Sequence, residues 1–318
     1  MNDPYENSGD YSPSEPLELV VPDTSGGQRL DQALAALLPQ HSRNRLQQWI
    51  RDACVDVDGT VVTEPKRKVL GGERLLLDLP DEAVSMAEQA EDIPLDIVFE
   101  DEALLVINKP AGLVVHPGSG NWNGTLMNAL LHHLPGIAEV PRAGIVHRLD
   151  KDTSGLMVVA KTLEVQTDLV RQLQARTVKR QYLAIAQGLI RRDGGVDTPI
   201  GRHPVQRIKM AVVPESRGGK PALTWYRRLE LFAHCTLLEC ALETGRTHQI
   251  RVHMASIGHP LLGDPVYGKR DPRLPVFKRQ ALHATRLGLV HPVTTRVMQW
   301  EVPMPEDMRD LVETLRYG

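Results

Sequence analysis

The chain has few of the residues on which several common kinds of site depend. Aromatic residues make up 4% of its 318 residues, so base stacking on aromatic platforms is not expected to dominate recognition. The three cysteines, Cys54, Cys235 and Cys240, lack C-x-x-C spacing, which argues against a zinc knuckle or a disulfide framework. No apolar run approaches the roughly 18 to 20 residues of a membrane span, and the polar first 16 residues do not resemble a targeting peptide. The sequence therefore predicts a reduced, cytoplasmic protein without a membrane segment.

Positive charge is missing from two segments of the chain, and this hides a basic remainder. Residues 1–27 contain six acidic residues and residues 81–102 contain nine, and neither segment contains lysine or arginine. Because the whole chain has a formal net charge of -3, setting these 15 acidic residues aside leaves +12 for the rest. A charge of that size indicates a surface that binds a polyanion. The alternative is that Arg and Lys only solvate the exterior.

Residues 17–80 have the pattern of a small basic domain. Helices are predicted over residues 29–38 and 43–51, and Asp58-Gly59 predicts a tight hairpin turn after them. This arginine-lined helix pair and hairpin resemble the alpha-L RNA-binding motif of a small-subunit ribosomal protein; an amphipathic helix pair with a solvated face is the alternative. The resemblance implies phosphate contacts by Arg43, Arg45, Arg51, Lys66, Arg67 and Lys68.

Composition also divides the remainder of the chain. Residues 1–16 are rich in Pro, Gly, Ser and Asn and predict a disordered acidic tail, and the acidic residues 81–92 predict a linker. Residues 93–318 alternate short apolar strands with a few helices, without a regular β-α-β rhythm. We therefore expect an α+β catalytic domain built on a mostly antiparallel mixed sheet.

The stretch His147-Arg148-Leu149-Asp150-Lys151-Asp152-Thr153-Ser154-Gly155 carries an unusual density of charge between two apolar, strand-like segments, residues 143–146 and 156–160. Arg148 and Lys151 flank Asp150, and nearby positive charge favours the ionised form of an aspartate. An ionised aspartate suits a nucleophile or a base. An aspartate that only caps a turn is the alternative.

A second polar stretch covers residues 243–254. Arg246 and Arg251 lie five residues apart across a glycine-containing turn that leads into a predicted helix, a place suited to binding a phosphate or a carboxylate. His248 and His253 are also five apart and lack the H-E-x-x-H pattern, so no metal site is expected.

Together these stretches resemble the signatures of the RluA/RluD family of pseudouridine synthases. The matching segments are KPAGLVVHP at residues 109–117, GIVHRLDKDTSGL at 144–156, TGRTHQIRVH at 244–253 and GHPLLGDPVYG at 258–268. Their order and spacing also match, and the resemblance covers residues 17–315. Residues 202–210 and the N-terminal basic domain resemble most the D-type members, which act on large-subunit ribosomal RNA.

The resemblance implies roles for five residues. Asp150 is the catalytic carboxylate, and Arg251 pairs with it and holds it ionised. Arg148 helps to extrude the target base, Tyr182 stacks on the flipped uracil, and Arg246 contacts RNA or the active site. The implied fold is the pseudouridine synthase fold with a small N-terminal alpha-L domain.

The expected function is isomerisation of specific uridines to pseudouridine in large-subunit (23S) ribosomal RNA, without a cofactor or a metal, by a monomer that takes part in ribosome biogenesis. The ionised aspartate either attacks C1′ or removes the C2′ proton. The alternatives are the same chemistry on tRNA or another ribosomal RNA site, a non-catalytic RNA-binding assembly factor, and a metal-dependent hydrolase built on the histidines.

Overall fold

The computed structural model describes residues 17–39, 43–78, 89–117, 121, 123–206 and 209–317. The chain divides into two compact units, and the boundary along the chain falls between Gln89 and Ala90. The acidic tail predicted over residues 1–16 and most of the predicted linker lie outside the described residues. None of the described helices is long and apolar enough to cross a membrane.

The N-terminal unit packs two helices against a small antiparallel sheet. The sheet has the strand order β1-β4-β2-β3, with β1 (Leu17–Val20), β2 (Val55–Val57), β3 (Thr60–Val61) and β4 (Arg74–Leu77). A short 3-10 turn, η1 (Asp23–Ser25), precedes α1 (Leu30–Leu37) and α2 (Arg43–Arg51). Leu46, Trp49 and Ile50 of α2 are buried in the unit's own core, as their spacing predicts. Asp58 and Gly59 have positive φ angles between β2 and β3, which confirms the predicted hairpin turn.

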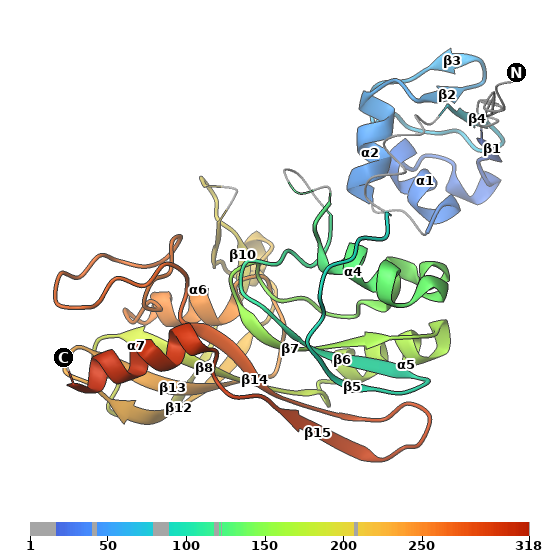
Figure 1. The fold of residues 1–318 in the computed structure, drawn as a ribbon. Helices are drawn as coiled ribbons and strands as arrows, with labels where there is room; N and C mark the ends of the chain where they lie inside the picture. The colour runs from blue at the N-terminus through green and yellow to red at the C-terminus, as the bar shows by residue number, and fades with distance from the viewer. Residues whose placement is uncertain are drawn as a thin grey trace, which may run out of the picture. The chain divides into compact units, whose positions relative to one another are not determined.

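The second unit is built on one large, almost entirely antiparallel sheet (Figure 1). Among the described residues nine strands join it in the order β5-β6-β7-β14-β8-β13-β12-β9, with β15 paired to β14. Their bounds are β5 (Ile97–Glu100), β6 (Leu104–Lys109), β7 (Ser154–Ala160), β8 (Lys179–Gln187), β9 (Gly194–Asp197), β12 (Leu223–Leu231), β13 (Cys235–Leu242), β14 (Leu282–Val290) and β15 (Val297–Glu301). β10 (Ile200–Arg202) and β11 (Met210–Val212) form a separate two-stranded sheet. Only the β7–β14 pair is parallel within this part of the chain, so the expected α+β architecture with a mostly antiparallel mixed sheet is confirmed.

Helices cover both faces of this sheet. One face packs against α4 (Leu126–His133), the turns η2 (Pro135–Glu139) and η3 (Pro141–Gly144), and α6 (Gln249–Ser256). The opposite face packs against α5 (Leu163–Gln174) near β7 and against α7 (Glu306–Tyr317) near β8 and β13. A further 3-10 turn, η4 (Glu215–Arg217), follows β11. Alternate residues of β6 point to the two faces, since Leu105 and Ile107 join one core and Leu104 and Val106 the other.

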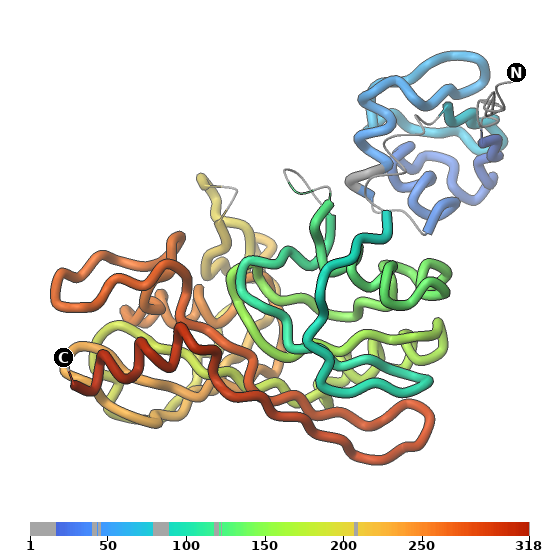
Figure 2. The backbone as a smooth tube through the Cα atoms, in the orientation of Figure 1, coloured from blue at the N-terminus to red at the C-terminus, as the bar shows by residue number. Residues whose placement is uncertain are grey.

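The parallel pair β7–β14 brings distant parts of the chain side by side, as the tube in Figure 2 shows. Gly155 makes this approach possible. It has a φ of 115°, and a Cβ at this position would lie 2.2 Å from the carbonyl oxygen of Ala284 on β14. The glycine that closes the charged stretch is therefore required by strand packing.

The apolar approach to the charged stretch is not the strand that the sequence predicts. Residues 141–144 form the turn η3, in which Arg142 and Ala143 have φ angles of 57° and 48°. Ile145 makes only an isolated β-bridge to Val159. Because two consecutive residues adopt left-handed conformations, the backbone cannot extend there. The apolar exit forms β7 as expected.

Candidate active site

The loop between η3 and β7 forms one wall of a cavity of about 110 Å³. Asp150, Arg148, Tyr182, Arg246 and Arg251 all line this cavity, although they lie on three separate segments of the chain. Tyr182 comes from β8, Arg251 from α6, and Arg246 from the turn before α6. The structure thus brings together all five residues that the sequence singled out in this unit.

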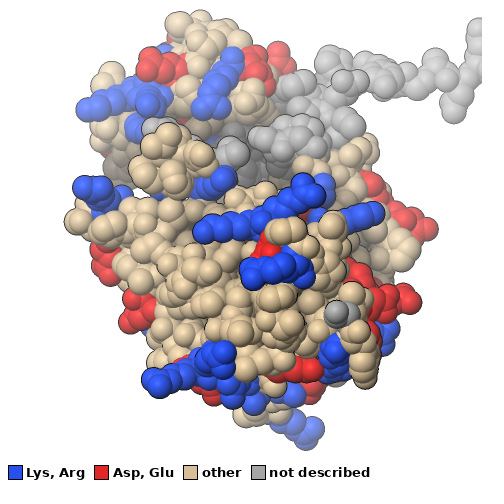
Figure 3. Space-filling view, turned by 90° about the vertical axis from the view of Figure 1, so that its left-hand side faces the viewer, with Lys and Arg blue, Asp and Glu red and all other residues tan. Residues whose placement is uncertain are grey.

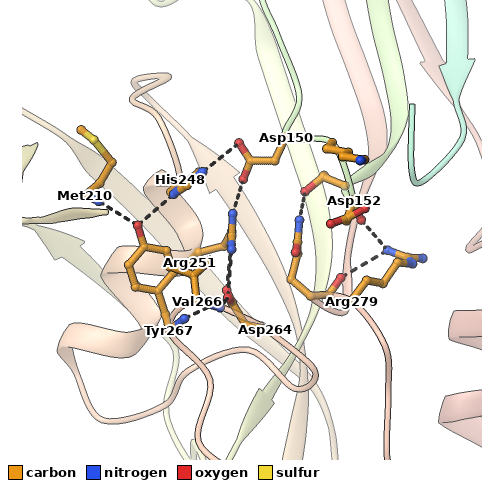
Figure 4. Close-up of polar contacts among 12 residues, drawn as sticks. Asp150, Asp152, Met210, His248, Arg251, Asp264, Val266, Tyr267 and Arg279 are labelled. Atoms are coloured by element: carbon orange, nitrogen blue, oxygen red, sulfur yellow. Dashed lines mark hydrogen bonds and ion pairs between the residues drawn. The ribbon is translucent and has the colours of Figure 1, made fainter. Parts of the chain in front are cut away.

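Arg251 links two carboxylates beneath the cavity (Figure 4). Its Nη1 donates to Asp150 Oδ2 at 3.0 Å, while Nε and Nη2 donate to the two oxygens of Asp264 at 2.7 and 2.9 Å. The Arg251 side chain is only 4% exposed and that of Asp264 is fully buried, whereas Asp150 is 18% exposed toward the cavity. The two parallel hydrogen bonds to Asp264 fix the plane of the guanidinium. This plane sets the position of Nη1, which in turn holds the carboxylate of Asp150.

The charges of this trio stabilise one another. Burial raises the pKa of the Asp264 carboxyl, but the hydrogen bonds and charge of Arg251 outweigh burial and hold this pKa below its usual range. Burial likewise lowers the pKa of Arg251, and Asp264 and Asp150 together raise it above its usual range. Backbone N–H groups of Val266 and Tyr267 also donate to Asp264 Oδ1. Asp264 is therefore a fully satisfied buried anion.

His248 stands on the other side of Asp150. Its Nε2 lies 3.8 Å from Asp150 Oδ1, and its Nδ1 lies 2.8 Å from the hydroxyl of Tyr267. That hydroxyl oxygen already accepts the backbone N–H of Met210, so we assign the hydroxyl as the donor to Nδ1 of His248, which accepts. Burial lowers the pKa of His248 even though Asp150 acts in the opposite direction. A neutral His248 with its proton on Nε2 then faces the carboxylate of Asp150.

Three donors hold the loop that follows Asp150, two through its backbone carbonyls and one through the side chain of Thr153. The buried ammonium of Lys109 donates to the carbonyl of Lys151 at 2.9 Å, and to two carbonyls of its own segment. Arg279 Nη1 donates to the carbonyl of Asp152 at 3.1 Å, and Gln280 donates to the hydroxyl of Thr153 at 3.1 Å. Burial lowers the pKa of Lys109 to about 8, against the opposing charges of Asp152 and Asp150. The loop is thus positioned through two main-chain carbonyls and one side-chain hydroxyl.

The other candidates differ in their freedom to move. Arg148 is exposed at the rim of the cavity. Tyr182 is 6% exposed, packs with the apolar lining residues Ile250 and Leu282, and has a pKa raised by burial. Arg246 is exposed and donates through Nε to the carbonyl of Pro221 at 3.0 Å. A flat uracil ring would meet an aromatic wall and a carboxylate in one enclosure.

In the N-terminal unit the predicted RNA-binding residues fall into two groups. Arg51, Lys66 and Lys68 are exposed and Arg67 is half-buried. Arg43 donates to the buried carboxylate of Asp31, which also binds Arg29. Part of the charge of Arg43 is therefore already balanced inside the unit. The side chain of Arg45 lies outside the described residues.

Several participants were not predicted from the sequence. Asp264, His248 and Tyr267 lie within the segments that resemble the family signatures, but the sequence alone does not assign them a role at the site. Lys109 lies in another of these segments, and the sequence alone does not assign it a role either. The available signal was a polar residue inside an apolar turn, as in Leu261-Leu262-Gly263-Asp264. In the described part of the chain, no three His, Cys, Asp or Glu side chains gather as a metal site would require.

Comparison with known families matches both units. Residues 103–256 match the family of RNA pseudouridylate synthases, and residues 28–75 match the S4 domain. The chain is 58% identical over 97% of its length to 90% of a protein of Nitrosomonas europaea named ribosomal large subunit pseudouridine synthase D. It is 55% identical over 94% of both chains to the protein of that name from Escherichia coli K12.

Solved structures agree with these matches. Human RNA pseudouridylate synthase domain containing 1 is 28% identical, with a TM-score of 0.55 over 73% of this chain and 98% of the human one. Human RNA pseudouridylate synthase domain containing 4 is 25% identical, with a TM-score of 0.54 over 74% and 95%. The expected S4-type N-terminal domain and pseudouridine synthase fold are both confirmed.

Proposed function

Because this chain belongs to the RluA/RluD family of RNA pseudouridine synthases, we propose that it converts specific uridines of large-subunit ribosomal RNA to pseudouridine. The observation that carries the proposal is the carboxylate of Asp150, held by Arg251 at the wall of a uracil-sized cavity that also contains Tyr182. The choice of RNA rests on the names of the relatives. We expect the protein to act as a cytoplasmic monomer.

The reaction needs one ionised carboxylate and room for a base to turn. The N1–C1′ bond of uridine breaks, the uracil rotates, C5 bonds to C1′, and the proton on C5 is released while N1 gains one. Bonds and electrons balance without an oxidant or a phosphate donor. Asp150 begins the sequence either by attacking C1′ or by removing the C2′ proton. With Arg251 on Oδ2, Oδ1 is left for this step.

The uridine must leave its stack to reach this carboxylate. Arg148 lies exposed at the cavity rim and would occupy the vacated position in the RNA, while the ring of Tyr182 would support the flipped uracil. His248 presents a neutral imidazole toward Asp150, so it adds a hydrogen-bond donor without a second full charge. The group that fixes the reactive geometry is Arg251.

RNA outside the cavity would be held by charge. One face of the second unit carries a group of Lys and Arg side chains, blue in Figure 3. The S4 unit adds Arg51, Lys66, Arg67 and Lys68, with Arg43 contributing less because Asp31 partly neutralises it. Contacts of this kind position the RNA without reading its sequence.

The test is the variant Asp150→Asn. It removes the negative charge but keeps the size of the side chain, so the melting temperature and RNA affinity should stay near those of the wild type. Release of tritium from C5-labelled uridine should fall by at least about a thousandfold, since the reacting group is lost. Asp310→Asn, on the exposed surface of α7, is the matched control and should keep full activity.

The outcomes separate the rival functions. Turnover of Asp150→Asn within tenfold of wild type would remove Asp150 as the catalyst. RNA binding by the wild type without tritium release from any uridine would favour a non-catalytic assembly factor. Loss of activity in EDTA would favour the metal-dependent hydrolase. Release from tRNA or from other ribosomal RNA sites would redirect the substrate assignment.

A further inference from the structure

The cavity that is lined by Asp150 and Tyr182 is called the uridine cavity below, and a second hollow adjoins it. It has a volume of about 530 Å³ and shares His147, Arg148, Arg180, Gly245 and Arg246 with the cavity. Two more arginines, Arg142 and Arg176, also line it. We call this second hollow the arginine groove.

Arg180 lies where the arginine groove and the uridine cavity meet, and it is a buried cation. Its side chain is 8% exposed, yet its Nε has no hydrogen-bond partner among the described residues. No ion pair to its guanidinium is found in the described part of the chain either, although Glu243 also lines the groove. Burying an unpaired guanidinium costs free energy, and proteins retain such a group where a ligand supplies the opposite charge.

The surrounding chain makes room for this guanidinium. A Cβ on Gly245 would lie 2.7 Å from Arg180 Nη1, so only glycine allows the turn before α6 to pass so close. The charge of Arg180 also acts on the cavity, where it adds to burial in lowering the pKa of His147 to about 3. His147 is therefore neutral and does not compete for an anion.

Two exposed arginines of the groove sit in left-handed backbone conformations. Arg142 has a φ of 57° and Arg176 a φ of 61°, and neither is glycine or asparagine, which adopt such angles more readily. Strained backbone of this kind recurs at ligand sites. Five arginines against one glutamate give the groove a strong positive charge.

We propose that the arginine groove is a phosphate-binding subsite in which Arg180 holds the RNA phosphate next to the flipped uridine, with Arg142 and Arg176 contacting the following phosphates. The proposal rests on the function proposed above, because continuity with the uridine cavity is what makes the occupant RNA and not an acidic peptide. The planar guanidinium can bind a phosphate through two parallel hydrogen bonds. Arg180 then binds and positions the RNA, and the anion that pairs with its guanidinium arrives with the substrate.

The experiment combines variants with neutral RNA linkages. Oligoribonucleotides containing the target uridine carry a single methylphosphonate at each linkage in turn, and both the dissociation constant and the tritium-release constants kcat and KM are measured. With wild-type protein, one linkage beside the uridine should weaken binding about 10- to 100-fold, as expected for a hydrogen bond between charged groups. Arg180→Met should weaken binding of unmodified RNA by a similar factor.

The decisive result is the combination of the two changes. Arg180→Met should be insensitive to the methylphosphonate at that one linkage but remain sensitive at the others, because the pair is already broken. Its melting temperature should equal or exceed that of the wild type, since an unpaired buried charge is removed. Arg180→Lys should retain part of the affinity, and Arg309→Met, exposed on α7, should change nothing.

Other results would overturn the proposal. These are wild-type affinity in Arg180→Met, additive losses at every linkage, or competition by polyglutamate as strong as that by RNA. A fall in the melting temperature of both Arg180 variants would assign Arg180 a structural role instead. Because binding is measured separately, tight linkage-dependent binding without tritium release would refute the proposed catalysis and leave the subsite intact.

Discussion

At the scale of single residues, Asp264 determines the geometry of the site without lying on the wall of the uridine cavity. It is fully buried and holds two of the three nitrogens that Arg251 uses for its hydrogen bonds. The third nitrogen binds Asp150. Arg251 would otherwise be free to rotate about its last torsions, and the carboxylate of Asp150 would lose its fixed partner.

The variant Asp264→Asn tests this dependence. An asparagine cannot accept both hydrogen bonds or balance the charge, so the free energy of unfolding should fall by about 3 kcal/mol, near the lower end for a broken buried ion pair, since Asp150 remains. The tritium-release kcat should fall at least about tenfold. Asp271→Asn, which breaks the pair with the exposed Arg273, should cost less than about 1 kcal/mol and leave kcat unchanged. A stable Asp264→Asn variant with full kcat would contradict the relay through Arg251.

The sequence alone could identify the charged stretch but not its partners. Asp150 is conspicuous because Arg148 and Lys151 flank it, whereas Arg251 is 101 residues away and was paired with it only through the family resemblance. Asp264 and Arg180 could not be assigned, because their burial depends on how α6 and β8 pack. A lone aspartate or arginine has no periodic pattern that reveals such packing.

At the scale of elements, helix α7 is linked to the loop that carries Asp150. Asp307, in its first turn, binds Arg279 through two hydrogen bonds of 2.7 and 2.9 Å. The remaining nitrogen of Arg279 donates to the carbonyl of Asp152, two residues after Asp150 (Figure 4). The C-terminal helix therefore supports the loop from the face of the sheet opposite α6.

We expect Asp307→Ala to lower the tritium-release kcat by about tenfold with little change in KM, because a loop displaced by a fraction of an ångström misaligns the carboxylate. Glu230→Ala is the matched control. It removes the two-pronged pair between Glu230 and Arg316 of the same helix, a pair with no link to the loop. If both variants lose the same activity, general loosening of α7 explains the effect and the positioning role is wrong.

The elements themselves were largely predictable. The helices expected at residues 29–38 and 43–51 correspond to α1 and α2 within one residue at either end, because apolar spacing marks them. The strand predicted for the apolar residues 143–146 is wrong, because the backbone at Arg142 and Ala143 is left-handed. The parallel pairing of β7 with β14 depends on sheet topology and has no local signal.

At the scale of the whole molecule, the acidic residues 81–92 predict a linker, and the structure divides between Gln89 and Ala90. The predicted domain limits at residues 80 and 93 stay a prediction. Each unit has its own apolar core, so each can bury its helices independently. What the sequence could not indicate is how many ionisable groups are buried in the second unit.

Buried and half-buried histidines in that unit should make the protein sensitive to mild acid. Burial lowers the pKa of His147 to about 3 and those of His116 and His283 to about 4, and it also lowers the pKa values of His248 and His253. The unfolded chain protonates its histidines near pH 6.5, so below that pH it binds more protons than the native state. Stability is therefore complete above about pH 6.5 and is lost as the pH falls toward 4.

The variant His147→Gln isolates one part of this effect. His147 Nε2 accepts the backbone N–H of Val158, and the glutamine oxygen can accept the same hydrogen bond, so stability at pH 7.5 should change little. From pH 7.5 to pH 5 the wild type should lose about 2 kcal/mol more than this variant, since a pKa near 3 forbids protonation in the native state throughout that range. Urea unfolding at the two pH values measures the difference. His132→Gln, at an exposed histidine of α4, should retain the full wild-type loss, and an identical pH slope in His147→Gln would show that this buried histidine is not a source of the acid sensitivity.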